Sequence, residues 1–228
     1  MDKSYIHLFD TTAEFDAAYN GTGYTDPWVS YTLESSALTY NKDRTNGHEY
    51  VDLGLPSGKL WATMNIGATS PEDYGNYYAW GELSGKSDYS WNTYKFGSAS
   101  PFTKYDQDGL TTLELVDDVA RTEWGGDWRM PTEADFQELT DNTTSVWDSE
   151  RSGRTFTSKT NGNSIFIPAA GYYDGTSRSG VGTDCYLWSS SLYPSDHNGA
   201  IGLYFYSGGI GMDSDDRCYG CSVRGVLD

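Results

Sequence analysis

The chain has 228 residues, enough for one large or two small domains with a buried core. Its formal net charge of −18 repels phosphate groups, which excludes nucleic acid and anionic membrane as expected partners. No run approaches the roughly 18 apolar residues of a membrane-spanning helix, and the opening MDKSYIHLFD lacks the apolar core of a signal peptide, so we expect a soluble, unprocessed chain without membrane insertion.

Residues 1–47 are predicted to form a small N-terminal module. A β-like run, YIHLF, is followed by TTAEFDAAY, where a threonine cap precedes an apolar helical stripe, and then by the β-rich DPWVSYTL. The polar NKDRTNGHE follows as a hinge, after which short strands are punctuated by Gly and Pro. The sequence therefore divides into a module at 1–47 and a domain at 48–228.

Two helices are predicted in the second domain. The first covers about residues 116–124, with apolar side chains at helical spacing and a Gly-Gly pair as its stop. The second begins at Thr132, which caps the helix while Asp135 completes an approximate capping box. Short runs rich in β-branched and aromatic residues predict three strands after these helices, at 164–173, 200–206 and 221–227.

The composition changes near the C-terminal end. The last 69 residues contain no Lys, Glu or Gln, whereas the first 159 contain 19 of them. Tyr, Ser, Gly and Asp dominate instead, as in antibody-type binding loops, where Tyr gives rigid contact area and small polar residues adapt. A codon that ends in a fixed pyrimidine and is randomised at its first two positions also cannot encode Lys, Glu, Gln, Trp or Met. Only Trp188 and Met212 break that restriction after Lys159, so both are expected to be fixed scaffold positions.

Several motifs of the second domain occur in a characteristic order. They are YVDLGLPSGKLWATMNIGATSPEDYGNYYAWGE (50–82), GGDWRMPTEADFQEL (125–139), NGNSIFIPAAGYY (161–173), YLWSSSLY (186–193) and CSVRGV (221–226). Together they resemble the variable proteins of diversity-generating retroelements. That group belongs to a C-type-lectin-like superfamily that includes the formylglycine-generating enzymes, whose RLPTEAEW signature is similar to RMPTEADF here. The resemblance covers about residues 50–226 and implies an α+β, loop-rich, C-type-lectin-like fold with two helices around a small twisted antiparallel sheet.

The resemblance also carries an expected function. It implies a non-enzymatic protein without a cofactor, whose hypervariable surface, over about residues 172–221, binds a ligand. Many such proteins are phage tail-fibre receptor-binding proteins, which set host tropism, or bacterial surface ligand-binders. We therefore expect a virion or bacterial cell-surface location and a bacterial cell-surface protein or glycan receptor as the partner. The leading module is similar to segments of gut-phage proteins, which favours the virion, and since fibre-tip proteins are often trimers, a homotrimer is one expected assembly.

Framework and display positions follow from the same resemblance. The expected framework is Trp188–Ser191, Leu203, Phe205, Ser207-Gly208, Met212, Arg217, Gly220 and Ser222–Val226. Exposed tyrosines are expected to act as anchors, and the polar positions between the framework residues are expected to set specificity. The predicted ligand-binding residues are Tyr172, Tyr173, Asp184, Cys185, His197, Gly199, Ile201, Gly202, Tyr206, Gly209, Gly211, Asp213, Ser214, Asp215, Asp216, Cys218, Tyr219 and Cys221.

Metal binding is the first alternative for this region. Cys218-x-x-Cys221 is half of a zinc site. Cys185 and His197 are the candidates for its two remaining ligands. The acids at 213–216 resemble part of a calcium loop but lack the glycine and the bidentate glutamate of an EF-hand. Variable thiols and solvated acids are the preferred interpretation, and no metal is predicted.

Two other function classes stay open. A formylglycine-generating-type enzyme is one, because those relatives use a pair of C-terminal cysteines, although the surrounding enzyme motif is missing here. A cell-envelope surface protein without a diversified ligand site is the other. His197 is interpreted as a contact residue rather than a catalytic base, and Arg129 and Arg224 as structural partners in buried or semi-buried polar pairs. Core packing is preferred over a sugar-stacking platform for the five tryptophans Trp61, Trp80, Trp124, Trp128 and Trp188.

Overall fold

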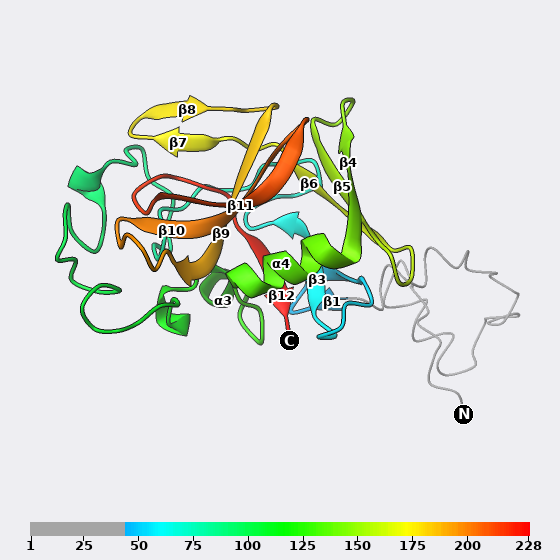
Figure 1. The fold of residues 1–228 in the computed structure, drawn as a ribbon, viewed down its shortest axis with the longest axis horizontal. Helices are drawn as coiled ribbons and strands as arrows, with labels where there is room; N and C mark the ends of the chain where they lie inside the picture. The colour runs from blue at the N-terminus through cyan, green and yellow to red at the C-terminus, as the bar shows by residue number, and fades with distance from the viewer. Residues whose placement is uncertain (1–43) are drawn as a thin grey trace, which may run out of the picture. The chain divides into compact units, whose positions relative to one another are not determined.

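The computed structural model describes residues 44–228, which form an α+β unit of small antiparallel sheets with few helices (Figure 1). The strands and helix predicted within residues 1–43 lie outside the described residues. The first strand, β1 (Arg44–Thr45), pairs with β2 (His48–Asp52) in an antiparallel hairpin. The domain boundary predicted at residue 47 is therefore displaced, because it falls in the turn of this hairpin and the folded unit extends to residue 44.

Four sheets make up the unit. The strands β1, β2, β3 (Leu60–Asn65) and β12 (Arg224–Leu227) form one sheet in that order, so the C-terminal strand pairs with an early one. A two-stranded hairpin consists of β7 (Tyr172–Asp174) and β8 (Ser177–Ser179). The two three-stranded sheets contain β4 (Thr143–Asp148), β5 (Gly153–Ser158) and β6 (Ser164–Pro168), and β9 (Asp184–Leu192), β10 (Gly199–Tyr206) and β11 (Gly209–Asp216).

The helices are short and begin at polar caps. Two 3-10 turns, η1 (Trp91–Thr93) and η2 (Leu115–Asp117), precede α3 (Val119–Trp124) and α4 (Glu133–Asn142). The predicted 116–124 helix is thus interrupted at Asp118, whose side chain accepts a hydrogen bond from the Arg121 N–H and caps α3. The capping box of α4 is confirmed, because the Thr132 hydroxyl and the Asp135 carboxylate each accept the other residue's backbone N–H.

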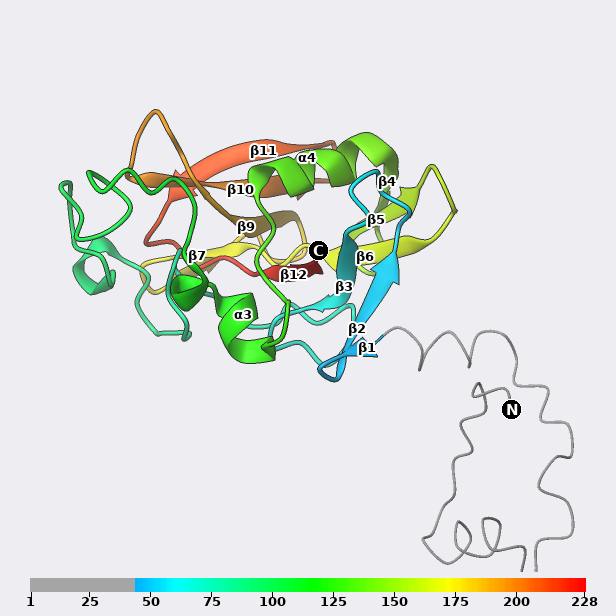
Figure 2. The same ribbon diagram turned by 90° about the horizontal axis from the view of Figure 1, so that it is seen from below.

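Two apolar clusters lie against opposite sides of the sheet β9–β11. One contains Trp80, Trp188 and Ala200, and the other contains Leu203 and Phe205 together with residues of α4. The register places Trp188 beside Gly202, on the side opposite to Leu203. Helix α4 packs on the Leu203 side of the sheet through Phe136 and Leu139, and its ribbon lies next to this sheet (Figures 1 and 2). The core prediction is confirmed for the four buried tryptophans, whereas Trp124 is partly buried and stacks on His48 with ring centroids 4.2 Å apart.

Arg224 ties the C-terminal strand into the interior. It is fully buried and donates hydrogen bonds to Asn65 Oδ1 (2.9 Å), the Ala62 carbonyl (3.0 Å) and the Phe166 carbonyl (3.2 Å). Burial lowers the pKa of this guanidinium to about 9. The prediction of a buried polar partnership is confirmed, and these bonds join β12 to β3 and β6.

Candidate functional site

The candidate site is the exposed part of one side of the sheet β9–β11. On β10, Ile201, Leu203 and Phe205 are buried, whereas Tyr204 and Tyr206 lie on the opposite side and reach solvent. Residues paired across antiparallel strands share a side of the sheet, so the register extends this surface to the neighbouring strands. We name it the outer face and define it by Asp184, Tyr186, Gly202, Tyr204, Tyr206, Gly209, Gly211, Asp213 and Asp215.

Tyrosine rings cross this surface as a continuous series. Successive ring centroids are 5.6 Å apart for Tyr219 and Tyr172, 4.8 Å for Tyr172 and Tyr186, 4.7 Å for Tyr186 and Tyr204, and 5.8 Å for Tyr204 and Tyr206. These separations lie within the range of favourable aromatic contacts. The tyrosine row, as we name these five residues, is therefore a set of mutually supported rings, of which Tyr206 is the most open at 43% exposure.

Backbone pairing brings Tyr172 and Tyr219 to the outer face. The Tyr173 N–H donates to the Gly220 carbonyl (2.8 Å), and the Gly220 N–H donates to the Tyr173 carbonyl (2.9 Å). Glycine is required at 220, because a Cβ there would lie 2.7 Å from atoms of the Tyr89 ring. The two backbone hydrogen bonds hold the turn before β12 against β7, and the rings of Tyr172 and Tyr219 meet there.

Carboxylates border the tyrosine row. Asp184 accepts hydrogen bonds from the Tyr204 hydroxyl (3.2 Å) and the Thr183 hydroxyl (2.6 Å). Asp213 is exposed, and its carboxylate accepts only the backbone N–H of Ser214 among the described hydrogen bonds. Asp215 is partly buried, and no described residue donates a hydrogen bond to its carboxylate. Burial, followed by the charges of Asp213 and Asp216, raises the pKa of Asp215 to about 6.

The structure brings part of the predicted site together. The predicted residues on the outer face or in the tyrosine row are Tyr172, Asp184, Gly202, Tyr206, Gly209, Gly211, Asp213, Asp215 and Tyr219.

Four predicted residues belong neither to the outer face nor to the tyrosine row, although the charge of one of them, Asp216, acts on Tyr219. Tyr173 packs against Tyr77 and Tyr89, and the Asp216 carboxylate interacts with the Trp91 side chain. His197 lies beyond the end of β9, with its Nδ1 2.9 Å from the carboxylate of Asp106. Ser214 pairs with Ile201 and therefore lies on the side of the sheet that α4 covers.

The prediction of ligand contact is wrong for five residues, because they are buried in the fold. Cys185 pairs with Phe205 and shares its interior side of the sheet, as does Ile201. Cys218 and Cys221 belong to the interior cluster that contains Trp80. The last of the five is Gly199, which is buried at the start of β10. Backbone hydrogen bonds between Cys221 and Tyr78 clamp that cysteine in place.

Sequence reasoning missed two central members of the tyrosine row. Tyr186 and Tyr204 face each other across β9 and β10 and hydrogen-bond or stack with predicted site residues. A signal for Tyr204 exists in the sequence, since it precedes Tyr206 by two positions and a strand places such residues on one side. Tyr186 is found only from the pairing register, because its own strand neighbours do not indicate which side faces solvent.

The cysteines have the environment of structural thiols. Burial raises the pKa of Cys185 and of Cys218 to about 12, and raises that of Cys221 well above its ordinary value. Metal ligation and nucleophilic attack both use the thiolate, which such environments disfavour at neutral pH. Within residues 44–228, the structure contains no cluster of three or more His, Cys, Asp or Glu side chains arranged to hold a metal ion.

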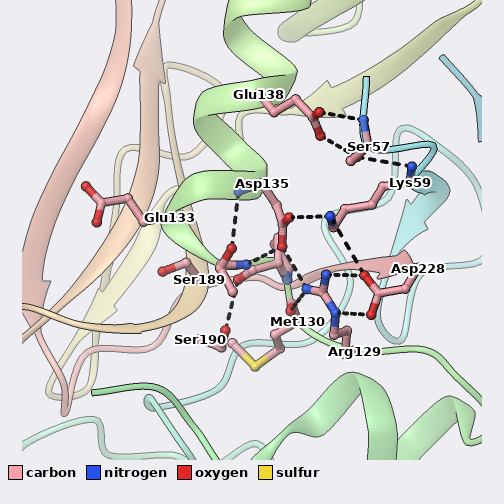
Figure 3. Close-up of polar contacts among 12 residues, drawn as sticks. Ser57, Lys59, Arg129, Met130, Glu133, Asp135, Glu138, Ser189, Ser190 and Asp228 are labelled. Carbon is pink, nitrogen blue, oxygen red and sulfur yellow. Dashed lines mark hydrogen bonds and ion pairs between the residues drawn. The ribbon is translucent and has the colours of Figure 1, made fainter. Parts of the chain in front are cut away.

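A second charged cluster lies at the start of α4 (Figure 3). Arg129 donates to Asp135 (2.7 Å) and, through two nitrogens, to Asp228 (2.6 and 3.0 Å), while Lys59 approaches Asp135 at 3.3 Å. Burial alone would raise the pKa of Asp135, but hydrogen bonds from Arg129 and Thr132 outweigh burial and lower it. Because these carboxylates are already paired, we interpret the cluster as a structural link between α4 and the C-terminal end, as predicted for Arg129.

A small surface cavity lies apart from the predicted site. Its volume is about 260 Å³, and its walls include His48, Glu49, Thr63, Glu123 and Trp124. None of the predicted ligand-binding residues lines it. The outer face is therefore the surface to which the sequence and structural observations point together.

Comparison with known proteins yields no relative. No family model, no curated protein and no solved structure matches the chain. No helix among residues 44–228 has the length and apolar character needed to cross a membrane.

Proposed function

We propose that this chain is a ligand-binding protein whose outer face contacts a partner on a bacterial surface. The main support for the proposal is the tyrosine row, in which contacting rings extend from β7 and the turn before β12 onto the outer face of the sheet β9–β11, beside carboxylates. Tyrosines provide large contact area with little loss of conformational entropy and are enriched among residues that dominate binding energy. Their support by a paired sheet preorganises the surface, which reduces the entropic cost of binding.

The proposal includes a C-type-lectin-like scaffold diversified by a retroelement. The strand-rich α+β architecture is compatible with that scaffold. Further support comes from β11, where Gly209, Gly211, Asp213 and Asp215 share the outer face while Met212 packs on the opposite side, against the cluster that contains Phe205. Such alternation lets outward residues change while inward ones maintain the core. The lack of Lys, Glu and Gln after residue 159 supports the same proposal.

The proposed role is that of a phage tail-fibre receptor-binding protein, or of a ligand-binder on the bacterial cell surface, without catalytic activity. The buried thiols support a non-enzymatic role. A formylglycine-type reaction would use accessible cysteines that can form thiolates, whereas burial raises the pKa of Cys218 and Cys221. The partner would be a bacterial surface protein or glycan, and a homotrimer is the expected assembly for a tail-fibre tip. Incubation with a Cys-containing peptide and copper should give no aldehyde by mass spectrometry.

Binding to intact cells tests the proposal. Fluorescently labelled full chain is titrated against a panel of bacterial strains by flow cytometry, and the Tyr186→Ser/Tyr204→Ser variant is compared on each strain that binds. Loss of two central anchors should weaken binding by about a hundredfold. The matched control is Val116→Ser/Val146→Ser, which removes two exposed apolar side chains elsewhere (68% and 65% exposed) and should change binding little. Equal effects of the two variants, or no binding to any strain, would count against the proposal.

A further inference from the structure

Charge is distributed unevenly around the outer face. Residues 160–228, all of which the structure describes, contain seven aspartates and three arginines. Arg217 and Arg224 are fully buried, which leaves Arg178 as the exposed arginine of this segment. Its guanidinium already donates to the Tyr77 hydroxyl and lies 4.8 Å from the centroid of the Tyr77 ring. The segment therefore presents more carboxylates than cations to solvent, with Arg178 as its one exposed arginine.

These carboxylates lie at both ends and along one side of the tyrosine row. Asp184 hydrogen-bonds Tyr204, and Asp213 occupies the neighbouring strand at the position opposite Gly202. At the other end, burial and then the charges of Asp174 and Asp216 raise the pKa of Tyr219 to about 12. A partner that covers the rings must therefore also come close to several negative charges.

Asp215 adds an independent observation. Its carboxylate is partly buried and receives no hydrogen bond from a described residue, and the charges of Asp213 and Asp216, which act on it, are also negative. Tyr172, Tyr186 and Cys221 also interact with it, and none of these three groups is a cation. An unpaired, partly desolvated carboxylate destabilises the free protein. Residues that reduce stability are typical of functional surfaces.

Space for a side chain exists beside these groups. A Cβ placed on Gly211 would meet no atom within 4 Å, whereas Gly211 lies directly opposite Tyr204 in the strand register. The outer face is therefore open beside the Tyr204 ring, and Asp213 is the next residue of β11 that lies on the same face. A long side chain with a terminal charge fits this combination of open space, ring and carboxylate.

We propose that the outer face binds a basic polypeptide surface, with arginine or lysine side chains of the partner lying on the tyrosine row and pairing with Asp213 and Asp215. The inference rests on the proposed function and specifies the chemistry of the partner. Cations lie favourably over tyrosine rings, and guanidinium groups pair with carboxylates through two hydrogen bonds. A phosphate-rich polymer would be repelled, and a neutral glycan would leave the carboxylates without a counter-charge.

Two synthetic peptides provide the probe. One contains four arginines separated by Gly and Ser, and the other carries neutral citrulline in place of each arginine. Binding of each to the full chain is measured by fluorescence anisotropy at physiological salt. Asp213→Asn/Asp215→Asn is compared with Glu123→Gln/Glu150→Gln, which removes the same charge from exposed positions outside the outer face.

The arginine peptide should bind about tenfold or more tightly than the citrulline peptide, and the outer-face variant should weaken it about tenfold. The control variant should weaken it by less than about twofold, the effect of general attraction to an acidic protein. Equal loss in both variants, equal binding of both peptides, or no measurable binding of the arginine peptide would overturn the inference. Cell binding by the two variants distinguishes failure of this inference from failure of the proposed function. If Tyr186→Ser/Tyr204→Ser abolishes cell binding while Asp213→Asn/Asp215→Asn preserves it, the outer face binds a partner that is not basic.

Discussion

The two sides of the sheet β9–β11 are made from alternate residues of the same strands, yet they have different physical roles. Leu203 and Phe205 are fully buried on the side that α4 covers. Tyr204 and Tyr206, which alternate with them along β10, belong to the tyrosine row on the other side. The buried side holds the strands in one register, and this register fixes which rings meet on the other side. A binding surface can thus change its side chains without changing the interactions that hold the fold together.

The largest expected effect comes from the buried side. Phe205→Ala leaves a cavity between β10 and the cluster that contains Trp61 and should reduce the free energy of unfolding by about 3–5 kcal/mol. Tyr204→Ala, one residue away, should cost about 1 kcal/mol because its ring stays partly solvated. Chemical denaturation of both variants measures the difference, and similar costs would show that the two sides are not distinct.

Asp215 should oppose folding at neutral pH. Its pKa is raised from 3.8 to about 6, so the folded state holds its proton more tightly than the unfolded state. The penalty is absent below pH 3.8, grows as the pH rises and is complete above about pH 6. Asp215→Asn should therefore stabilise the protein by about 2–3 kcal/mol at pH 7.5 and by nothing near pH 3.5. Urea unfolding at the two pH values checks this, and a destabilised variant at pH 7.5 would contradict it.

Asp135 should show the opposite sign. Its pKa is lowered in the fold, so its stabilising effect is present above the unfolded pKa of about 3.8 and is lost as the pH falls through the folded value. Asp135→Asn weakens the links to Arg129 and Lys59 and should destabilise the protein by about 1–2 kcal/mol at pH 5 and at pH 7.5. The same unfolding series measures this, and a variant that matches the wild type at both pH values would show that the cluster is not stabilising.

The smallest effect is expected at an open glycine of the outer face. Gly211→Ser places a side chain where no atom lies within 4 Å and should change the free energy of unfolding by less than about 0.5 kcal/mol. Gly202→Ser is its counterpart, because a Cβ there would lie 2.7 Å from the Leu187 carbonyl oxygen. Thermal unfolding should separate the two, and equal melting temperatures would show that the backbone yields at position 202.

Local features of the fold were predictable from the sequence, whereas its pairings were not. The capping box at Thr132 and Asp135 was found because both partners lie within one helical turn. The β1–β2 hairpin was missed because Asn46-Gly47 sits inside a polar stretch that also fits a hinge. A turn and a linker share this composition, and only pairing across the turn distinguishes them.

The candidate site was predictable only in part for a related reason. Composition located the segment, and the resemblance supplied the candidates Asp213, Ser214, Asp215 and Asp216. Only the strand register shows that Asp213 and Asp215 share the outer face while Ser214 lies on the opposite side. Chain position alone could not show that Cys218 and Cys221 enter the interior, because both belong to a cluster of residues from distant parts of the chain, and Cys221 pairs with Tyr78, more than a hundred residues earlier. Tyr186 joined the site for the same reason, through its register with Tyr204.

The central claim is that the outer face varies while the buried side of the same sheet is kept constant. Sequencing the DNA that flanks the gene tests it most directly. If a retroelement diversifies the outer face, the flanking DNA should contain a reverse transcriptase gene and a near-copy of the 3′ coding region whose mismatches fall at adenines. Mismatched codons should include those of outer-face residues such as Asp213 and Asp215, and should spare those of Leu203, Phe205 and Cys221. Absence of the near-copy, or mismatches in the codons of these buried residues, would contradict it.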